Sequence, residues 1–277
     1  MYSSPTILMC PPIYYGIEYE INPWMDRTRV VDTRLAAQQW DTLHALILDC
    51  GAQIELTDPV EGLPDMVFTA NAALIYRSIA ILSQFRHEQR KGEEKHWRSE
   101  LADRQFRIEW PAENIAFEGA GDALFCGESL YAGYRIRSDA TGHQGIAEAM
   151  GISVIPLELV DDYFYHLDTC FCPLSPTEAI YYPGAFDEYG RTVLRQSIPE
   201  LIEVELDEAR RFACNAVVIH KNIITSTGCP RLHARLRDRG WSPREADLGE
   251  FIKAGGSAKC LTLRLDGEEG AVWTEPS

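Results

Sequence analysis

The sequence predicts a repeated α/β architecture. Short apolar segments typical of β-strands alternate with longer segments in which apolar residues recur at helical spacing. The segments fall into about five units of two or three strands and one helix, and each such unit needs its neighbours to bury its apolar face. No low-complexity linker separates them, and 277 residues, 45% of them hydrophobic, can form a substantial core. We therefore expect one closed domain over residues 1–277.

The first half of the chain contains two helical segments. Residues 32–49 place Leu35 and Trp40 at near-helical spacing, and Gly51 follows where this helix should end. Residues 93–104 form a second, highly charged helix. The strands expected around these helices are residues 6–10, 53–56, 66–68, 72–76, 79–82, 106–110, 123–125 and 129–134.

The second half continues the alternation. Helices are expected over residues 142–150, which Gly151 ends, over residues 208–212, and over residues 230–239, which begin with a proline and are closed by a glycine. The strands expected here are residues 153–157, 163–174, 178–182, a hairpin of 216–219 and 223–226, and a last strand over 261–265.

The composition excludes several classes of protein. The chain has 26 basic and 42 acidic residues, which give a formal charge of −16. This charge argues against sequence-independent binding to nucleic acid, which needs lysine and arginine opposite the phosphates. No run of 18 apolar residues and no secretory leader is visible, so we expect a cytoplasmic protein that does not cross a membrane. The eight cysteines form no CxxC pair and are expected to be reduced thiols. The sequence leaves open whether the protein is a monomer or a homo-oligomer.

A loop near the end of the chain carries a candidate nucleophile. Cys260 follows a run of small residues and is expected at the start of the last strand. Gly255 and Gly256 allow the backbone to approach a ligand closely. Lys253 and Lys259 are expected to lower the pKa of the thiol toward the nucleophilic thiolate. A small buried cysteine that only packs beside a strand explains this loop equally well. Catalytic partners elsewhere in the chain are needed to distinguish the two interpretations.

Two earlier turns place polar side chains among apolar strands. Asn71 lies just beyond one such strand. Glu118 and Asp122 lie in a turn where Gly119 and Gly121 free the backbone to aim both carboxylates at one point. A solvated surface turn has the same composition, and taken alone this turn favours that interpretation.

A further stretch combines a histidine with a carboxylate. Over residues 163–174, strand alternation would put His166 and Asp168 on one face, in line with Cys170 and Cys172. A neighbouring carboxylate orients a histidine and makes it more basic, as a general acid/base requires. The same four residues suggest a metal site, but side chains spaced along one strand cannot converge on one ion, so we expect no metal there.

Together these residues indicate covalent chemistry at a thiol. The chain has a candidate cysteine, a histidine and several carboxylates, but no GxSxG nucleophile elbow. A carboxylate-rich site would hold a cation such as a guanidinium group. Attack of Cys260 on the guanidinium carbon would require Glu118 and Asp122 to stabilise that charge, and His166 to protonate the leaving amine.

These stretches resemble the guanidine-modifying enzymes of the pentein superfamily, which includes arginine deiminases, dimethylarginine hydrolases and amidinotransferases. The resemblance covers nearly the whole chain and is strongest to arginine dihydrolases, which form the N-terminal domain of a bifunctional cyanobacterial enzyme. It implies a five-bladed α/β propeller of pseudo-repeated ββαβ units around a central substrate channel. It rests on residues 21–25, 68–71, 117–124, 166–174 and 253–263.

The resemblance also implies roles in catalysis. Cys260 would be the nucleophile and His166 the general acid/base, with Glu118 beside it on the guanidinium group. Asp122 and Asp168 match further carboxylates that bind the guanidinium group.

Three residues match positions that hold the amino-acid end of arginine: Asn22, Arg90 and Arg137. An arginine side chain suits the substrate carboxylate at such a position. Arg135 competes with Arg137 for this role, and a surface charge is the simpler interpretation of Arg90, which lies in a polar run.

Asn71 distinguishes between the reactions of the superfamily. Deiminases and dimethylarginine hydrolases resemble this stretch but have an aspartate there. A neutral asparagine cannot fix the guanidinium group by charge, so a ureido intermediate could be held and processed again. The resemblance thus implies an arginine dihydrolase, which converts L-arginine to ornithine, carbon dioxide and two ammonia without a metal or organic cofactor. An arginine deiminase, a hydrolase of methylated arginine or another guanidino compound, and a non-catalytic amino-acid-binding protein remain as alternatives.

Overall fold

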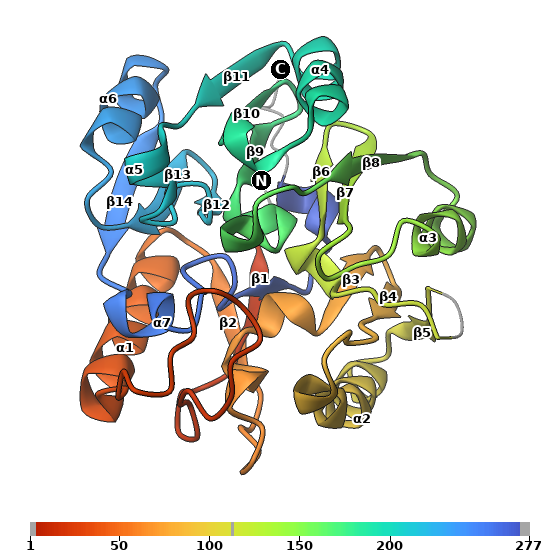
Figure 1. The fold of residues 1–277 in the computed structure, drawn as a ribbon, viewed down its shortest axis with the longest axis vertical. Helices are drawn as coiled ribbons and strands as arrows, with labels where there is room; N and C mark the ends of the chain where they lie inside the picture. The colour runs from red at the N-terminus through yellow and green to blue at the C-terminus, as the bar shows by residue number, and fades with distance from the viewer. Residues whose placement is uncertain (1–3, 112–113, 272–277) are drawn as a thin grey trace.

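The computed structural model describes residues 4–111 and 114–271, which form five small three-stranded sheets. Figure 1 shows the sheets following one another around a common centre, with the long helices outside them. In every sheet two strands form an antiparallel pair, and the third strand follows a helix and pairs parallel with the second. The predicted α/β propeller of five ββαβ units is therefore confirmed.

Three of these units follow one another in the middle of the chain. The first consists of β3 (Ala73–Tyr76), β4 (Ile79–Leu82), α2 (Glu88–Asp103) and β5 (Arg107–Glu109). The second consists of β6 (Ala123–Cys126), β7 (Ser129–Tyr134), α3 (Gly142–Met150) and β8 (Val154–Glu158). The third consists of β9 (Phe171–Ser175), β10 (Glu178–Tyr181), α4 (Glu188–Ser197) and β11 (Glu200–Glu203).

The two remaining units close the ring. The fourth consists of β12 (Val217–Ile219), β13 (Asn222–Ser226), α6 (Pro230–Asp238) and β14 (Ser242–Ala246). The fifth combines β15 (Leu263–Arg264) from late in the chain with β1 (Thr6–Met9), α1 (Thr33–Asp49) and β2 (Gln53–Leu56) from its beginning. Short helices α5 (Leu206–Ala209) and α7 (Gly249–Ile252) lie outside this repeat. The pairing of β15 with β1 anchors the loop before β15 at the centre.

Helix α1 shows how local sequence sets the limits of an element. Asp32 caps its first turn by accepting a hydrogen bond from the backbone N–H of Leu35 at 2.9 Å. After the helix Gly51 takes a φ of +95°, a conformation that glycine adopts without strain. The buried face of the helix presents Trp40 and Leu43 to the core, whereas Leu35, which the helical spacing placed on the same apolar face, is exposed.

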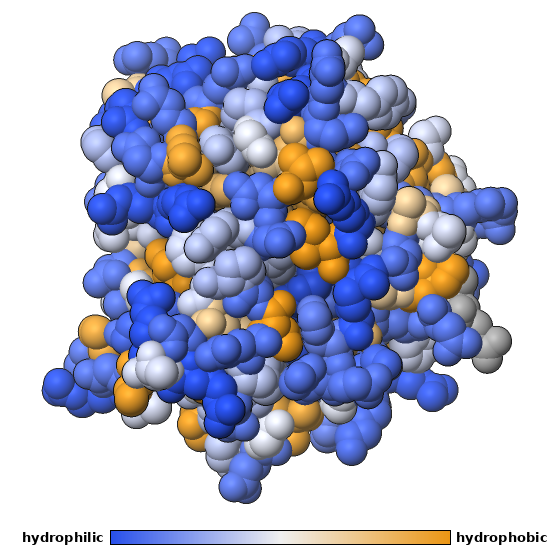
Figure 2. All heavy atoms as spheres, viewed as in Figure 1, coloured by the Kyte–Doolittle hydropathy of each residue, from blue (hydrophilic) through white to orange (hydrophobic). Residues whose placement is uncertain are grey.

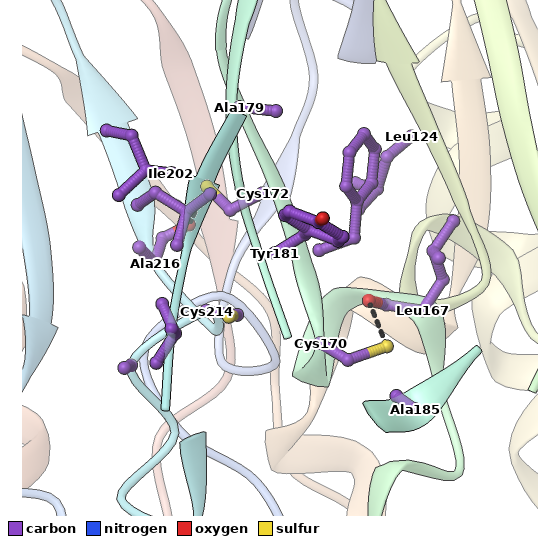
Figure 3. Close-up of a cluster of buried hydrophobic side chains, with 14 of the residues drawn as sticks. Leu124, Leu167, Cys170, Cys172, Ala179, Tyr181, Ala185, Ile202, Cys214 and Ala216 are labelled. Atoms are coloured by element: carbon purple, nitrogen blue, oxygen red, sulfur yellow. Dashed lines mark hydrogen bonds between the residues drawn. The ribbon is translucent and has the colours of Figure 1, made fainter. Parts of the chain in front are cut away.

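The interior between sheets is apolar and contains most of the cysteines. Figure 3 shows Cys170, Cys172 and Cys214 among the side chains of one such cluster, which also includes Leu124 and Tyr181. Burial raises the pKa of the Cys172 thiol to about 12. Cys170 and Cys172 therefore belong to the core and not to a polar site.

Several predicted elements differ from the structure. Residues 66–68 were expected to be a strand, but they belong to 3₁₀ turns that bring Asn71 inward. Of the predicted strand 163–174, only the part from Phe171 onward is strand, and residues 167–169 form a 3₁₀ turn. Helix α2 begins five residues earlier than expected, and α4, β11 and β14 were not predicted. Cys260 precedes β15 by three residues instead of opening it.

The surface is polar. Most side chains on the face shown in Figure 2 are hydrophilic, with hydrophobic residues scattered between them. Among the helices within residues 4–111 and 114–271, none is both long and apolar enough to cross a membrane.

Candidate active site

Most of the candidate functional side chains lie in the turns that lead into the first strand of a sheet, whereas Asn22, Arg90 and Arg137 come from other segments. Glu118 and His166 each precede such a strand by five positions, since they come before β6 and β9. Asp168 and Cys260 each precede one by three positions, before β9 and β15. Because the units repeat one geometry, side chains at the same offset occupy equivalent places around the centre. The fold thus brings together residues that are far apart in the sequence.

An ion-paired carboxylate holds the histidine. His166 Nε2 lies 2.7 Å from Glu118 Oε2, and Arg137 Nη1 donates to the same oxygen at 2.9 Å. All three residues are buried. Burial alone would raise the pKa of Glu118, but Arg137 and His166 outweigh it and hold this pKa well below its ordinary value. Glu118 is therefore an anion that can stabilise a protonated His166.

The candidate nucleophile lies beside a second carboxylate. Cys260 Sγ is 3.3 Å from Asp168 Oδ2, and both residues are buried. Burial raises the pKa of the Cys260 thiol well above its ordinary value, and the nearby Asp168 raises it further. Burial also raises the pKa of Asp168 to about 7. The thiol of the free protein is therefore protonated at neutral pH.

The pKa of the Cys260 thiol is raised and not lowered, so the expectation based on the two neighbouring lysines was wrong. Lys259 Nζ lies 3.0 and 3.2 Å from the two carboxylate oxygens of Glu268. Lys253 Nζ lies 2.7 and 2.9 Å from those of Glu250. Each ammonium group thus faces a carboxylate partner of its own.

Asn71 lies against the backbone of Glu118. Its Nδ2 donates to the Glu118 carbonyl oxygen at 3.0 Å, and its Oδ1 accepts from Arg90 Nη1 at 3.0 Å. Gly121 permits this approach, because a Cβ at that position would lie 2.3 Å from Asn71 Nδ2 and 3.6 Å from His166 Cγ. The neutral amide is thereby fixed in orientation on the histidine side of the site.

Arg90 is buried, so its interpretation as a surface charge was wrong. Its Nε and Nη2 atoms bind the two carboxylate oxygens of Glu93 at 2.8 and 2.9 Å. Its Nη2 also donates to the carbonyl oxygen of Asp65 at 3.3 Å, and the Asp65 carboxylate lies 3.8 Å from its Nε. Since Nη1 holds Asn71, Arg90 connects this buried acidic group to the candidate site.

Asp122 supports the turn that carries Glu118. Its Oδ2 accepts from Ser138 Oγ at 2.5 Å, and its Oδ1 accepts from the backbone N–H of Leu167 at 3.1 Å. The same Ser138 Oγ accepts from the backbone N–H of Glu118 at 3.0 Å. Burial raises the pKa of Asp122 to about 6. Both carboxylate oxygens of Asp122 thus have partners in the protein.

The segment between β1 and α1 lies over the site. It is the red loop on the face turned to the viewer in Figure 1. Asn22 Nδ2 donates to the carbonyl oxygen of Ala254 at 3.0 Å, and Asn22 Oδ1 accepts from the backbone N–H of Trp24 at 2.9 Å. Trp24 Nε1 donates to the carbonyl oxygen of Tyr163 at 2.8 Å. Asn22 therefore fixes a cover that joins the loop before Cys260 to the stretch before His166.

Two residues that the structure brings to the site were not identified from the sequence. Asn215 is fully buried, and its Nδ2 lies 3.1 Å from Cys260 Sγ. It precedes β12 by two positions, as Asn71 precedes β3, so a comparison of equivalent turns would have found it. The second residue, Asp65, lies buried against Arg90, and only its position in the stretch that leads to Asn71 indicated it.

Comparison with known families gives one match over most of the chain. The family model described as eukaryotic N,N-dimethylarginine dimethylhydrolase matches residues 20–265.

Three known proteins illustrate the similarity. The bifunctional arginine dihydrolase/ornithine cyclodeaminase ArgZ of Synechocystis is 45% identical over 265 residues, which are 94% of this chain and 37% of that protein. The chain thus spans less than two fifths of the length of this relative. The dimethylarginine dimethylaminohydrolase of Mycobacterium tuberculosis is 39% identical over 93% of this chain and 84% of that protein. A crystal structure of the N-terminal domain of ArgZ, a cyanobacterial arginine dihydrolase, with substrate bound superposes with a TM-score of 0.92, 44% identity, and coverage of 95% of this chain and 98% of that one.

Proposed function

The chain belongs to the family of N,N-dimethylarginine dimethylhydrolases, and from this premise we propose that it is an arginine dihydrolase. The reaction is the hydrolysis of L-arginine to ornithine, carbon dioxide and two molecules of ammonia, by covalent catalysis at Cys260. The observation that carries this choice within the family is the neutral Asn71 amide beside Glu118. The similarity to the N-terminal domain of ArgZ, an arginine dihydrolase, supports the same choice.

The charges of the site suit a guanidinium group. Glu118 is anionic, and the Oδ1 atom of Asp168 has no hydrogen-bond partner among the described residues. A guanidinium group bound between these carboxylates would lower the pKa of Asp168 and of Cys260, because a nearby positive charge favours the ionised forms. The thiol proton can then pass to Asp168 Oδ2, 3.3 Å from the sulfur. In this way the substrate activates its own nucleophile.

The amino-acid end of arginine would lie under the cover that Asn22 fixes. Arg90 and Arg137 are buried cations, and the substrate carboxylate would join the partners that they already have, Glu93 and Glu118. Asp65, a buried carboxylate beside Arg90, suits its ammonium group.

The first round of chemistry replaces one nitrogen of the guanidinium group by oxygen. The Cys260 thiolate attacks the guanidino carbon, a C–S bond forms, and the electron pair of the C=N bond moves to nitrogen. His166 protonates the leaving nitrogen through Nδ1, since its Nε2 faces Glu118, and ammonia departs. A water molecule that gives its proton to His166 then attacks the carbon, the C–S bond breaks, and citrulline and the thiolate result.

The second round repeats these steps on the ureido carbon of the bound citrulline. Ammonia leaves again, and water releases a carbamate of ornithine, which loses carbon dioxide. One arginine and two waters thus give one ornithine, one carbon dioxide and two ammonia. A neutral Asn71 suits this second round, because the ureido group carries no charge that an aspartate could bind.

The second candidate is a dimethylarginine dimethylaminohydrolase. It is favoured by the family match and by the Mycobacterium tuberculosis relative, most of whose length this chain covers. Such an enzyme would use the same cysteine and histidine but release dimethylamine and citrulline.

Analysis of the products tests the proposal. Purified protein is incubated separately with L-arginine, citrulline and dimethylarginine, with a Cys260→Ser variant as the blank. We expect ornithine and ammonia in a ratio of one to two from arginine. Citrulline with one ammonia would show a deiminase, and dimethylamine from dimethylarginine would show the second candidate. Binding of arginine without turnover would overturn the enzymatic proposal.

A further inference from the structure

Asn215 contacts both members of the thiol–carboxylate pair. Its Oδ1 accepts from the backbone N–H of Cys260 at 3.2 Å. Its Nδ2 donates to Cys260 Sγ at 3.1 Å and to the carbonyl oxygen of Asp168 at 3.0 Å. Asn215 is fully buried, so water does not compete for these hydrogen bonds.

The orientation of this amide follows from its partners. The backbone N–H of Cys260 can only donate, so the amide oxygen must face it. The carbonyl oxygen of Asp168 can only accept, so the amide nitrogen must face it. The second N–H of Nδ2 is then directed at the sulfur, which receives a fixed donor.

This donor acts where other charges oppose ionisation of the thiol. The Asp168 carboxylate, 3.3 Å from the sulfur, disfavours a thiolate, and the ammonium group of Lys259 faces Glu268. A hydrogen bond to the charged form of a group favours that form, and such bonds are stronger than those between neutral groups. Asn215 therefore stabilises the thiolate without adding a charge that would repel a guanidinium group.

We propose that Asn215 is a further catalytic residue, which holds Cys260 in place and donates a hydrogen bond to its sulfur whenever the thiolate forms. The inference rests on the proposed role of Cys260 as nucleophile and adds a residue to that site. The thiolate is the attacking group at the start of each round and the leaving group at its end. One donor on the sulfur therefore assists both steps, in both rounds.

The Asn215→Asp variant tests this assignment by replacing a single heavy atom, the amide nitrogen, by oxygen. An ionised carboxylate would place negative charge beside the sulfur, and a protonated one has a single O–H for two acceptors. We expect kcat for arginine to fall by about 10²-fold, as for loss of one catalytic hydrogen-bond donor, with KM changed far less. We also expect alkylation of Cys260 by iodoacetamide, read by mass spectrometry at alkaline pH, to slow by about tenfold, a pKa shift of about one unit.

Asn222→Asp is the matched control, since it makes the same change at the start of β13, where the amide donates to the carbonyl oxygen of Ile219. It should leave kcat and alkylation unchanged. If Asn215→Asp alkylates and turns over as fast as the unsubstituted protein, Asn215 is no catalytic residue. If Asn215→Asp shows no cooperative thermal unfolding and is therefore not folded, Asn215→Ala is used instead. The same slowing of turnover and of alkylation is expected for it. If the protein does not hydrolyse arginine at all, alkylation still decides the role of Asn215.

Discussion

Around Glu118 and His166 the protein supplies its own cation, Arg137, whereas around Cys260 and Asp168 the neighbouring lysine is bound to another carboxylate. Burial is nearly complete in both halves of the site, so it does not explain their difference. The presence of a cation explains the difference. The pKa of Glu118, which has Arg137 beside it, falls below its ordinary value, whereas the pKa of Asp168 rises to about 7.

The two halves, Glu118 with His166 and Cys260 with Asp168, have different roles. The histidine half holds its charges before any ligand arrives, as a general acid/base requires. In the thiol half, Cys260 stays protonated until a guanidinium group supplies the missing positive charge. A thiol kept protonated in this way is protected from other electrophiles, since the thiolate is the reactive form.

The largest expected effect comes from removing the sulfur. Cys260→Ser should lower kcat with arginine by a factor on the order of 10⁴ or more, because a catalytic unit without its nucleophile loses almost all of its advantage. Cys50→Ala, which removes another thiol at the end of α1, is the control and should retain activity. Ammonia release measures both. Full activity of Cys260→Ser would exclude the covalent mechanism.

Removing the charge of the histidine half should have the next largest effect. Glu118→Gln leaves His166 without its anion and Arg137 buried without its partner, and we expect kcat to fall by a factor on the order of 10³. A thermal melt must accompany the assay, since breaking a buried ion pair costs about 3–5 kcal/mol of stability. Glu128→Gln, in the exposed turn between β6 and β7, is the matched control. Equal activity of both variants would show that the anion is not needed.

Asn71→Asp should change the product more than the rate. A carboxylate at this position would bind the cationic first intermediate and disfavour the neutral ureido group, so citrulline should become the main product. Chromatography of the amino acids formed from arginine measures the ratio of citrulline to ornithine. An unchanged ratio would mean that Asn71 does not select the second round.

The pH dependence should show the smallest change and concerns the thiol half alone. Asp168, with a pKa of about 7 in the folded protein, is protonated below that pH and cannot accept the thiol proton. We therefore expect kcat/KM to rise with pH through about 7, by at most about tenfold per unit. Lys259→Met should move this rise to higher pH, because Lys259 opposes the effect of burial on Asp168. A flat profile between about pH 6 and 8 would contradict this role.

Most of the fold could be predicted from the sequence, because the spacing of apolar residues distinguishes strands from helices. The prediction of secondary structure was wrong in the turns whose conformation depends on contacts at the centre of the ring. The turns before Asn71 and His166 have sequences typical of strands, because their apolar residues are buried by neighbouring units and not by strand pairing. Helix α4 was missed because it is short and mostly polar: its few apolar residues lie at helical spacing, but only Leu194 among them is a buried large side chain.

The sequence also identified residues that meet, but not all of their pairings or their charge states. Glu118 contacts His166 and Asp168 contacts Cys260, whereas the expected strand alternation had paired His166 with Asp168. The effect of Lys259 on the thiol could not be judged from adjacency in sequence, because its partner Glu268 is reached only through the fold. Asn215 had no neighbouring motif, and only the repeated position of the turns reveals it.

The protonation state of Cys260 in the empty site tests the account most directly. The ultraviolet absorbance of the thiolate is titrated in the unsubstituted protein and in Cys260→Ser, and the difference isolates this sulfur. We predict no thiolate signal up to a pH of about 9 in the free protein, and its appearance near neutral pH when methylguanidinium is added at saturating concentration. A thiolate already present at neutral pH without a guanidinium compound would contradict the account.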